Sequence, residues 1–386
     1  KYHLGSSKKI TTASGEEVRI NLVPNPSHLE TVASLVGGIS RAKIDHTYQG
    51  NAKKVLPIVI HGDAAIAGQG IVYEVAQMMT LEGYKTGGTV HIVVNNQVGF
   101  TTNYLDARSS IYCTDIAKVT DSPVMHVNAD DVEAVVHAIR FAADYRAQFG
   151  KDVYIDLLGY RKYGHNEGDE PRFTQPSLYK TISKHPNPRE IYKKKLVEEG
   201  VVSDAVMSEM EKEFKNILDQ NFDEAKEIER NTMAIFMEED WKDYASLGKL
   251  QQVLENYNTT YDVEKLRELA VKISTLPADK KFINKISRLF EARVKMVENN
   301  ALDWAMGELL AYGTLLTEGS TIRISGEDVE RGTFSNRHAV VKTEDNEEEY
   351  VPLRQVSDNK FDIYNSHLSD YGVLGFDFGY AMASPN

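Results

Sequence analysis

Cysteine is nearly absent from the sequence: Cys113 is the only one among 386 residues. A single thiol cannot form an internal disulfide or a cysteine-rich metal site, and this scarcity favours a reducing compartment. Basic residues are also few, with 44 Lys and Arg against 57 Asp and Glu and a formal net charge of -13. Because nucleic-acid phosphates are held by an excess of Lys and Arg, we expect no nucleic-acid partner. A small anionic ligand stays compatible with this charge, since it needs only a local group of donors.

Long apolar runs are missing as well. No stretch approaches about 18 uncharged apolar residues, so we expect no transmembrane helix and no membrane partner. The sequence begins at Lys1, no signal-peptide pattern follows it, and we expect both ends to be cuts within a longer protein. Hydrophobic residues make up 41% of the chain, which provides enough apolar material for a globular core.

The first part of the chain contains a regular series of short apolar runs. Four of them have the length and composition of buried β-strands, at residues 55–61, 89–95, 123–127 and 153–158. Their starts lie roughly 30 to 34 residues apart, about the length of a strand–helix–strand unit. Helical spacing of apolar residues occurs between them, at 70–81 and 131–146. Continuous rather than alternating apolar runs predict an α/β fold with a parallel, doubly wound sheet.

The rest of the chain divides into a helical middle and a second α/β region. We predict three parts: an α/β domain at 1–184, a helical linker at 185–299 and the start of a second α/β domain at 300–386. The linker is rich in Glu and Lys, and we expect helices over 189–200, 203–230, 262–274 and 279–298. After residue 300 we expect a helix, a strand, a hairpin and a final helix, over 303–316, 321–325, 338–353 and 373–383.

Polar residues follow each of the four predicted strands, where an open parallel sheet binds its ligands. Asp63 follows the first strand, and Asn96 follows the second, 33 positions later. Adjacent parallel strands would bring both side chains together, and their hard oxygen atoms suit Mg2+ with a diphosphate. The glycines at 68 and 70 would let an anion approach the next helix. The alternative is structural: the Gly-Asp pair at 62–63 merely caps a helix, and the Asn-Asn pair at 95–96 makes a turn.

Longer motifs surround these two residues. They are HGDAAIAGQGIVYE from residue 61, GGTVHIVVNNQVGFTT from 87, KDVYIDLLGYRKYGHNEGDEPRFTQP from 151 and RISGEDVERGTFSNRHAV from 323. With them, essentially the whole chain resembles the thiamine diphosphate-dependent dehydrogenase component of 2-oxoglutarate dehydrogenase complexes. The resemblance implies a thiamine diphosphate-binding fold, with a diphosphate- and Mg2+-binding domain first and a pyrimidine-binding domain beginning near residue 300. It also implies an internal segment of a longer polypeptide.

The resemblance assigns roles to individual residues. Asp63, Asn96 and the carbonyl group of Val98 would bind Mg2+, and His28 and His61 would line the catalytic cavity. The full set that it implies for cofactor binding is Asp63, Ala64, Ala65, Asn96, Gln97, Val98 and His165. Two arginines are candidates for contacts to anions, at positions 108 and 161. The alternative for each of these histidines is a structural hydrogen-bonding role, and the alternative for each of these arginines is a solvated surface charge.

One catalytic position departs from the family motif. The family has a glutamate that activates the aminopyrimidine ring of the cofactor, within the motif LSE, and here the motif ends in Asp370. Asp370 keeps the acid on a side chain that is one methylene shorter, and misplacement on this scale can cost about 100-fold in rate. Either the activating role is lost or the backbone compensates. Asp377 makes the same exchange at a position expected to be structural.

The activity implied by the resemblance is oxidative decarboxylation of 2-oxoglutarate in the tricarboxylic acid cycle. The succinyl group would pass to the lipoyl group of dihydrolipoyl succinyltransferase, within a multienzyme complex that contains this protein as a homodimer. The compartment would be the bacterial cytoplasm or, alternatively, the mitochondrial matrix. We expect the isolated 386-residue segment to be inactive, because its second domain is unfinished.

Other functions stay open. One is the same chemistry on 2-oxoadipate, and another is a non-catalytic scaffold in which Asp370 marks lost activity. A nicotinamide-dependent dehydrogenase is disfavoured, because residues 68–70 do not complete a GxGxxG motif. Cys113 could be a nucleophile, but no His or Asp partner is implied, and an inert thiol is favoured.

Overall fold

The computed structural model describes residues 2–229, 236–244, 254 and 256–385. Lys1, Arg230 and Asn386, where predicted segments begin or end, lie outside the described residues, as do parts of the predicted linker. The chain forms two compact units, one of Lys1–Trp241 with Phe378–Ser384 and the other of Lys242–Asp377 with Pro385–Asn386. The division at 1–184, 185–299 and 300–386 remains a proposal.

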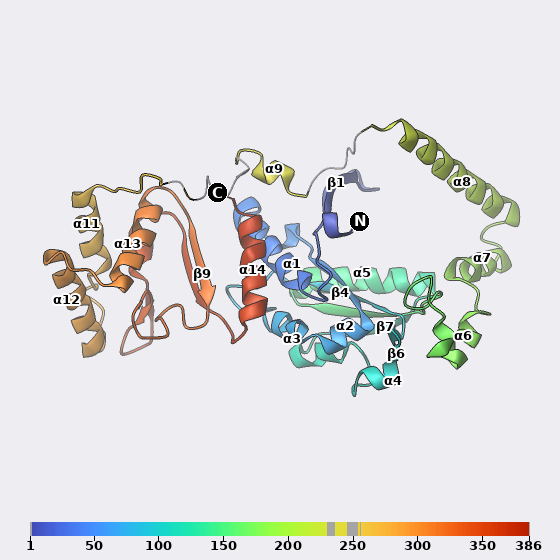
Figure 1. The fold of residues 1–386 in the computed structure, drawn as a ribbon, viewed down its shortest axis with the longest axis horizontal. Helices are drawn as coiled ribbons and strands as arrows, with labels where there is room; N and C mark the ends of the chain where they lie inside the picture. Colours follow the sequence, from blue (N-terminus) through green and yellow to red (C-terminus); the bar gives the residue numbers. More distant parts are fainter. Residues whose placement is uncertain (1, 230–235, 245–253, 255, 386) are drawn as a thin grey trace. The chain divides into compact units, whose positions relative to one another are not determined.

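A four-stranded parallel sheet lies at the centre of the first unit (Figure 1). Its strands, in order across the sheet, are β3 (Ile58–Gly62), β4 (Val90–Asn95), β8 (Val153–Leu158) and β7 (Val124–Asn128). All four predicted strands are therefore confirmed. Because β3 and β4 are neighbours, with His61 beside Val93, the segments that follow them leave the sheet side by side.

Helices cover both faces of this sheet (Figure 1), which confirms the doubly wound architecture. They are α5 (Val132–Phe149) on one face, and α2 (Asp63–Gly68) and α3 (Gly70–Gln77) on the other. On the α5 face, Ala138 packs with Val90 and Ile155. On the opposite face, Ile66 and Tyr154 share a cluster. Successive residues of a strand thus point to opposite faces of the sheet and pack against different helices.

The helix predicted over 70–81 has the wrong extent. Helical structure begins earlier, because α2 starts at Asp63 directly after β3. Gln69 is extended (φ -91°, ψ 119°) and separates α2 from α3. The second helix ends at Gln77, since residues 78–80 form a turn. The Gly-Asp pair thus stands at the start of a helix, with Gly62 at the N-cap position, but no side-chain hydrogen bond among the described residues caps this helix.

The N-terminal part contains three elements that the sequence pattern does not predict. β1 (Ser6–Thr11) and β2 (Glu17–Leu22) form an antiparallel hairpin, and α1 (Val32–Ala42) follows. Gly37 and Gly38 lie within α1, and glycine is a poor helix former, so the helical signal in the sequence is weak.

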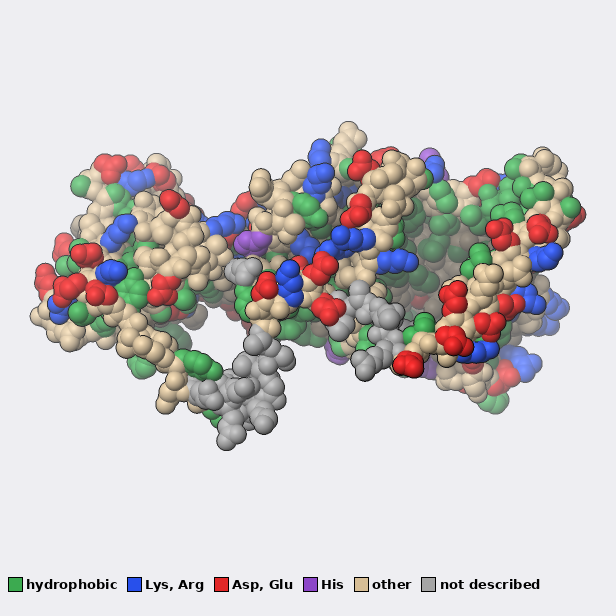
Figure 2. Space-filling model, turned by 90° about the horizontal axis from the view of Figure 1, so that it is seen from above, with side chains coloured by type: hydrophobic (Ala, Val, Ile, Leu, Met, Phe, Trp, Pro, Cys, Tyr) green, Lys and Arg blue, Asp and Glu red, His purple; other side chains and the backbone are tan. Residues whose placement is uncertain are grey.

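Two predicted helices of the middle region are confirmed as α7 (Pro188–Glu198) and α8 (Asp204–Glu227). The side chain of Asn187 caps α7, and that of Ser203 caps α8. No residue of α8 is buried, and charged side chains alternate along it with exposed hydrophobic ones (Figure 2). The shorter elements of this unit are β5 (Val98–Gly99), β6 (Thr102–Asn103), α4 (Tyr104–Ala107), α6 (Pro176–Ile182) and α9 (Glu238–Trp241).

The second unit is built on a two-stranded parallel sheet, β9 (Ile322–Gly326) and β12 (Phe361–Asn365). Three predicted helices are confirmed as α11 (Val263–Ile273), α12 (Asn284–Glu298) and α13 (Trp304–Thr317), but α12 begins five residues after the predicted start at 279. The predicted hairpin is confirmed by β10 (Val341–Lys342) and β11 (Glu349–Tyr350), which pair in antiparallel orientation. The last helix is α14 (Asp370–Met382). The strand β12 was not predicted.

Its core packs α11 and α13 against β12, through Leu269, Ile273, Met306, Leu316, Leu353 and Phe361, and Ile322 and Ile324 of β9 pack against this cluster. Among the described residues of the whole chain, no helix combines the length and the apolar character that crossing a bilayer requires.

Candidate functional site

Asp63 lies where β3 ends and α2 begins. Its side chain is buried, and the backbone N–H groups of Asp63, Ala64 and Asn96 lie near enough to its carboxylate to stabilise the charged form. Burial raises the pKa of Asp63 above its ordinary value, because loss of water disfavours the charged form. The guanidinium group of Arg108 and the backbone donors act in the opposite direction. The structure thus brings Asp63 and Asn96 together, as the adjacency of their strands led us to expect.

The segment after β4 is a tight turn held by side-chain amides. The amide oxygen of Asn95 accepts the N–H of Gln97 at 3.2 Å, and that of Asn96 accepts the N–H of Val98 at 3.2 Å. Gln97 has a left-handed backbone (φ 67°), and its side chain donates to the carbonyl of Gly159 at 2.8 Å. An amide oxygen has two lone pairs, so the oxygen of Asn96 keeps one for a cation.

The chain beyond this turn passes close to the first turn of α2, where Ala64 and Ala65 are half-buried. A Cβ atom added at Gly99 would lie 2.5 Å from the Cβ of Ala64, closer than two side-chain carbons approach. Only glycine fits at position 99 while residue 64 is an alanine. The contact fixes the predicted cofactor-binding residues of α2 against those of the turn.

Exchange of Gly99 for alanine is expected to destabilise the protein by about 1–3 kcal/mol, the usual cost of overpacking. The double exchange Ala64→Gly/Gly99→Ala should recover most of this loss, because it moves the methyl group to the other side of the same contact. Gly68→Ala is the matched control, since nothing lies within 4 Å of a Cβ there. Urea unfolding measures all three, and equal stability of the Gly99→Ala and Gly68→Ala proteins would contradict the close contact.

Arg108 lies beside Asp63, and two of its donor atoms have no partner among the residues that the structure describes. Its side chain is 8% exposed, and its Nη1 atom lies 3.8 Å from Oδ2 of Asp63, beyond hydrogen-bond distance. Its Nε and Nη1 atoms are buried without a hydrogen-bond partner in the part of the chain that the structure describes. Buried donors without an acceptor cost free energy, so the arrangement fits an anionic ligand.

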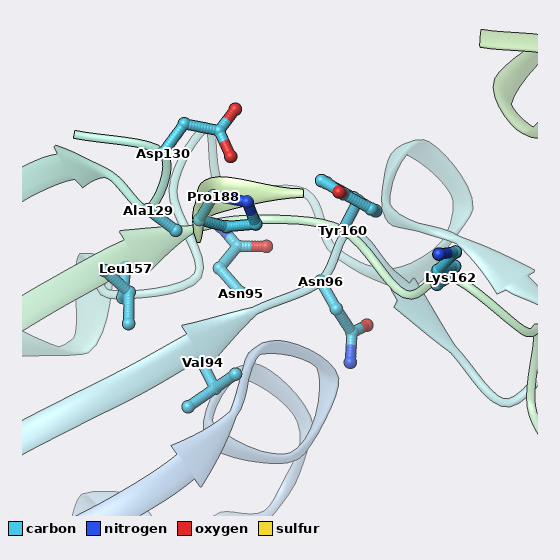
Figure 3. Close-up of a pocket in the computed structure, with 10 residues that line it drawn as sticks. Val94, Asn95, Asn96, Ala129, Asp130, Leu157, Tyr160, Lys162 and Pro188 are labelled. Atoms are coloured by element: carbon cyan, nitrogen blue, oxygen red, sulfur yellow. The ribbon is translucent and has the colours of Figure 1, made fainter. Parts of the chain in front are cut away.

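A pocket of about 290 Å3 lies at the carboxyl ends of β4, β7 and β8 (Figure 3). Its lining consists of Val94, Asn95, Asn96, Ala129, Asp130, Leu157, Gly159, Tyr160, Lys162 and Pro188. Val93 faces α2, and successive side chains of a strand point to opposite faces of the sheet. Val94 and Leu157, which line the pocket, therefore point to the α5 side, and the pocket opens on that side. Of the predicted site residues, Asn96 lines this pocket.

His61, a predicted catalytic residue, belongs to a buried row of polar side chains. Its Nδ1 atom donates to Oε2 of Glu30 at 2.6 Å, and its Nε2 atom lies 2.9 Å from Nδ1 of His91. Nε2 of His91 in turn lies 3.4 Å from Oδ2 of Asp152. The ring of His91 also stacks on Tyr154, with centroids 4.2 Å apart. Burial lowers the pKa of His61, and both of its nitrogens contact other side chains.

Sequence reasoning missed the partners in this row. Glu30 belongs to the motif NPSHLE, which is the one signal that could have indicated it. Asp152 precedes β8 and carried no signal, because an aspartate before a strand is common in loops.

The remaining predicted residues have different surroundings. His28 is exposed between β2 and α1. The ring of His165 stacks on Phe100 at 4.5 Å, and its Nδ1 atom is buried without a hydrogen-bond partner among the described residues. Arg161 is half-buried and donates to the backbone carbonyl of His165, so it is not simply a solvated surface charge. Asp370 is the exposed first residue of α14 and belongs to the second unit.

Cys113 is 2% exposed, and its Sγ atom lies 3.7 Å from Oδ1 of Asp156. Burial, together with the negative charge of Asp156, raises the pKa of Cys113 to about 12. The thiol therefore stays protonated near neutral pH, and the inert alternative is supported over the nucleophile.

We expect native protein at pH 8 to react with iodoacetamide far more slowly than unfolded protein, because the reagent needs an accessible thiolate. Mass spectrometry after an hour should show little modification of native chains and one modification per chain in guanidinium chloride. Complete native labelling at the rate of a free thiol would show that Cys113 is exposed.

The donor set can be compared with the ligands that it was predicted to hold. In the described ranges, no group of three or more His, Cys, Asp or Glu side chains could hold a metal ion. A site of one carboxylate, one amide and one carbonyl is typical of magnesium, which keeps water and phosphate oxygens as its other ligands. Asp63 offers the carboxylate, and Arg108 offers unsatisfied donors to an anion. The residues present fit a metal–diphosphate pair.

Two family models match the chain. The family described as Dehydrogenase E1 component matches residues 1–233. The family described as Transketolase, pyrimidine binding domain matches residues 300–386.

Several curated relatives are similar to the whole chain. The 2-oxoglutarate dehydrogenase, mitochondrial, of Schizosaccharomyces pombe is 44% identical over 100% of this chain and 39% of its own length. The 2-oxoglutarate dehydrogenase E1 component of Azotobacter vinelandii is 45% identical over 100% of this chain and 41% of its own length. The protein of that name from Staphylococcus epidermidis is 43% identical over 98% and 41%. The chain thus spans about two fifths of the length of these relatives. Since the first family model covers more than half of it, the chain belongs to the dehydrogenase E1 component family.

Proposed function

We propose that this chain is part of an enzyme that oxidatively decarboxylates 2-oxoglutarate with thiamine diphosphate and Mg2+. The observation that carries the proposal is the buried pair of Asp63 and Arg108, a carboxylate beside a guanidinium group with unsatisfied donors. The pair lies where β3 and β4 end, which is where an open parallel sheet binds its ligands. The names of the relatives support 2-oxoglutarate as the substrate.

In this proposal the two oxygens of Asp63 and Asn96 and the carbonyl of Val98 bind Mg2+, and Arg108 binds the diphosphate. We propose that four further residues also bind the cofactor: Ala64, Ala65, Gln97 and His165. Thiamine diphosphate supplies the carbon nucleophile that cleavage of a 2-oxo acid requires. The contribution of the protein is to hold the charged end of the cofactor with a preformed set of donors, so that little reorganisation is needed on binding.

The two predicted catalytic histidines differ in what supports them. His28 is exposed, and an imidazole there can donate to a substrate carboxylate near neutral pH. Both nitrogens of His61 are already in contact with Glu30 and His91, so we propose that it acts by holding Glu30.

Asp370 is the proposed acid that activates the cofactor ring, and it stands first in α14 with an exposed side chain. Asp377, the second aspartate of this helix, accepts from Nε of Arg323 at 3.1 Å and from the hydroxyl of Ser325. Its carboxylate therefore anchors α14 to β9, which supports a structural role and leaves Asp370 as the candidate for chemistry.

The assembly is also a proposal. We propose a homodimer within a multienzyme complex of the tricarboxylic acid cycle, in the bacterial cytoplasm or the mitochondrial matrix. The succinyl group would pass to the lipoyl group of dihydrolipoyl succinyltransferase. The second family match supports assigning residues 300–386 to a pyrimidine-binding domain.

The test is carbon dioxide release by the full-length protein from 2-oxoglutarate and from 2-oxoadipate, with thiamine diphosphate, Mg2+ and an artificial electron acceptor. We expect kcat/KM to be at least about tenfold higher for 2-oxoglutarate, since one methylene changes binding by roughly 1–3 kcal/mol. A higher kcat/KM for 2-oxoadipate would show that 2-oxoadipate, and not 2-oxoglutarate, is the substrate. Tight binding of thiamine diphosphate without any release of carbon dioxide would favour the non-catalytic scaffold. If Asp370→Glu then restores carbon dioxide release, the loss of activity is due to the shorter side chain of Asp370.

A further inference from the structure

Asp156 places a carboxylate in the middle of the sheet. It belongs to β8, is 3% exposed, and lies beside Val93 of β4 and His126 of β7. A buried carboxylate costs free energy unless both of its oxygens are satisfied. What Asp156 binds therefore indicates why a charged residue is present at this position.

Both oxygens of Asp156 have partners. Oδ1 accepts from Nδ2 of Asn95 at 2.9 Å, and the thiol of Cys113 lies 3.7 Å away. Oδ2 accepts from Nδ1 of His126 at 2.8 Å. The bond to Asn95 is the one that reaches the candidate site, because Asn95 immediately precedes Asn96.

This bond fixes the orientation of the Asn95 amide. An ionised carboxylate only accepts hydrogen bonds, so the NH2 group of Asn95 must face Asp156 and its oxygen must point the other way. There the oxygen accepts the N–H of Gln97 at 3.2 Å and closes the turn. Gly159 holds the same turn from β8, since its N–H donates to the carbonyl of Asn95 at 2.8 Å and its carbonyl accepts from Gln97.

We propose that Asp156 is a positioning residue for magnesium binding, which acts through Asn95 to set the turn that carries Asn96 and the Val98 carbonyl. This inference rests on the proposed function and extends it to a residue that touches neither the metal nor the cofactor. Asp156 is suited to the role because a charged acceptor makes a stronger hydrogen bond than a neutral one and prevents the amide from rotating.

The first measurement is Mg2+ affinity of the full-length protein at saturating thiamine diphosphate. Asp156→Ala should weaken Mg2+ binding about 10- to 100-fold, the range typical for residues that orient metal ligands. Asp156→Asn should recover much of this loss, because an amide oxygen can still accept from Asn95. His126→Phe is the matched control: it removes the other partner of the same carboxylate, and we expect Mg2+ affinity to change less than about threefold.

The second measurement needs no metal. Hydrogen exchange of the backbone amides in residues 94–100 should accelerate in Asp156→Ala, because the turn loses its anchor, and should stay unchanged in His126→Phe. Thermal unfolding of each variant shows whether the fold is kept. If Asp156→Ala fails to fold, Asn95→Ala removes the same bond from the other side and should give the same two effects.

Unchanged Mg2+ affinity and unchanged exchange in a folded Asp156→Ala or Asn95→Ala protein would overturn the positioning role alone, provided that the wild type binds thiamine diphosphate with Mg2+. A wild-type protein that shows no Mg2+-dependent binding would overturn both this inference and the proposed function. The two failures are thus distinguished by the wild-type titration.

Discussion

Replacement of Asp63 with alanine should abolish Mg2+-dependent binding of thiamine diphosphate to the full-length protein. Asp63 is the only carboxylate among the three proposed ligands, and the other two are neutral oxygens of Asn96 and Val98. We expect affinity to fall by more than about 100-fold, since removing a ligand exceeds the 10- to 100-fold loss typical of residues behind the ligands. Isothermal titration calorimetry with and without Mg2+ measures the effect.

The matched control is Asp131→Ala, because Asp131 also stands between a strand and a helix. Its carboxylate caps α5 by accepting the N–H of Ala134 at 3.0 Å. Loss of this cap should cost about 1 kcal/mol of stability and leave cofactor affinity unchanged. Equal cofactor affinity of the Asp63→Ala and wild-type proteins would refute the ligand assignment.

Replacement of Arg108 with methionine is expected to weaken thiamine diphosphate binding at saturating Mg2+ by about 10- to 100-fold. A hydrogen bond from a charged donor contributes about 1.5–3 kcal/mol, and each 1.4 kcal/mol is a factor of ten. Methionine fills a similar volume without donors. The fold should be kept, because the backbone N–H groups near the carboxylate of Asp63 still stabilise its charge. Calorimetry gives the affinity, and circular dichroism on heating gives the stability.

Two further exchanges define what Arg108 contributes. Arg108→Lys keeps the charge without the planar fork, and we expect an affinity between those of wild type and Arg108→Met. Arg140→Met, on the exposed side of α5, is the control for a general effect of charge and should bind like wild type. If Arg108→Met binds thiamine diphosphate as tightly as Arg140→Met does, the unsatisfied donors do not serve the diphosphate.

The central sheet was predictable because its inner strands β4 and β8 are largely buried on both faces, whereas the edge strand β3 is buried on one. Runs such as 89–95 and 153–158 are mostly apolar apart from single polar residues such as His91 and Asp156, and that pattern has few alternatives when helical segments lie between the runs. Capping residues located the helix starts more precisely, since Ser203 and Asp262, predicted as N-caps, cap α8 and α11 in the structure.

Other elements depend on partners that the local sequence does not show. The strand β12 is stabilised by its pairing with β9, which lies about 35 residues earlier in the chain, so its own sequence does not reveal it. The hairpin of β1 and β2 exposes most of its side chains, so its sequence lacks the alternation that marks a half-buried strand.

The candidate site was predictable only in part for the same reason. The meeting of Asp63 with Asn96 follows from two neighbouring strands, and the spacing of 33 residues indicates it. The approach of Arg108 to Asp63 depends on the path of the loop after β4, and the contact of Glu30 with His61 joins two segments without any shared pattern. Such contacts are decided by tertiary packing, which periodicity does not report.

The row that contains His61 also joins segments that lie far apart in the chain. Glu30 precedes α1, His61 and His91 belong to the neighbouring strands β3 and β4, and Asp152 precedes β8. Both nitrogens of each ring lie close to another side chain of the row, so turning a ring would separate it from two neighbours at once. Exchange of any one of these side chains for an apolar residue therefore leaves the next one with a buried polar atom that has lost its partner.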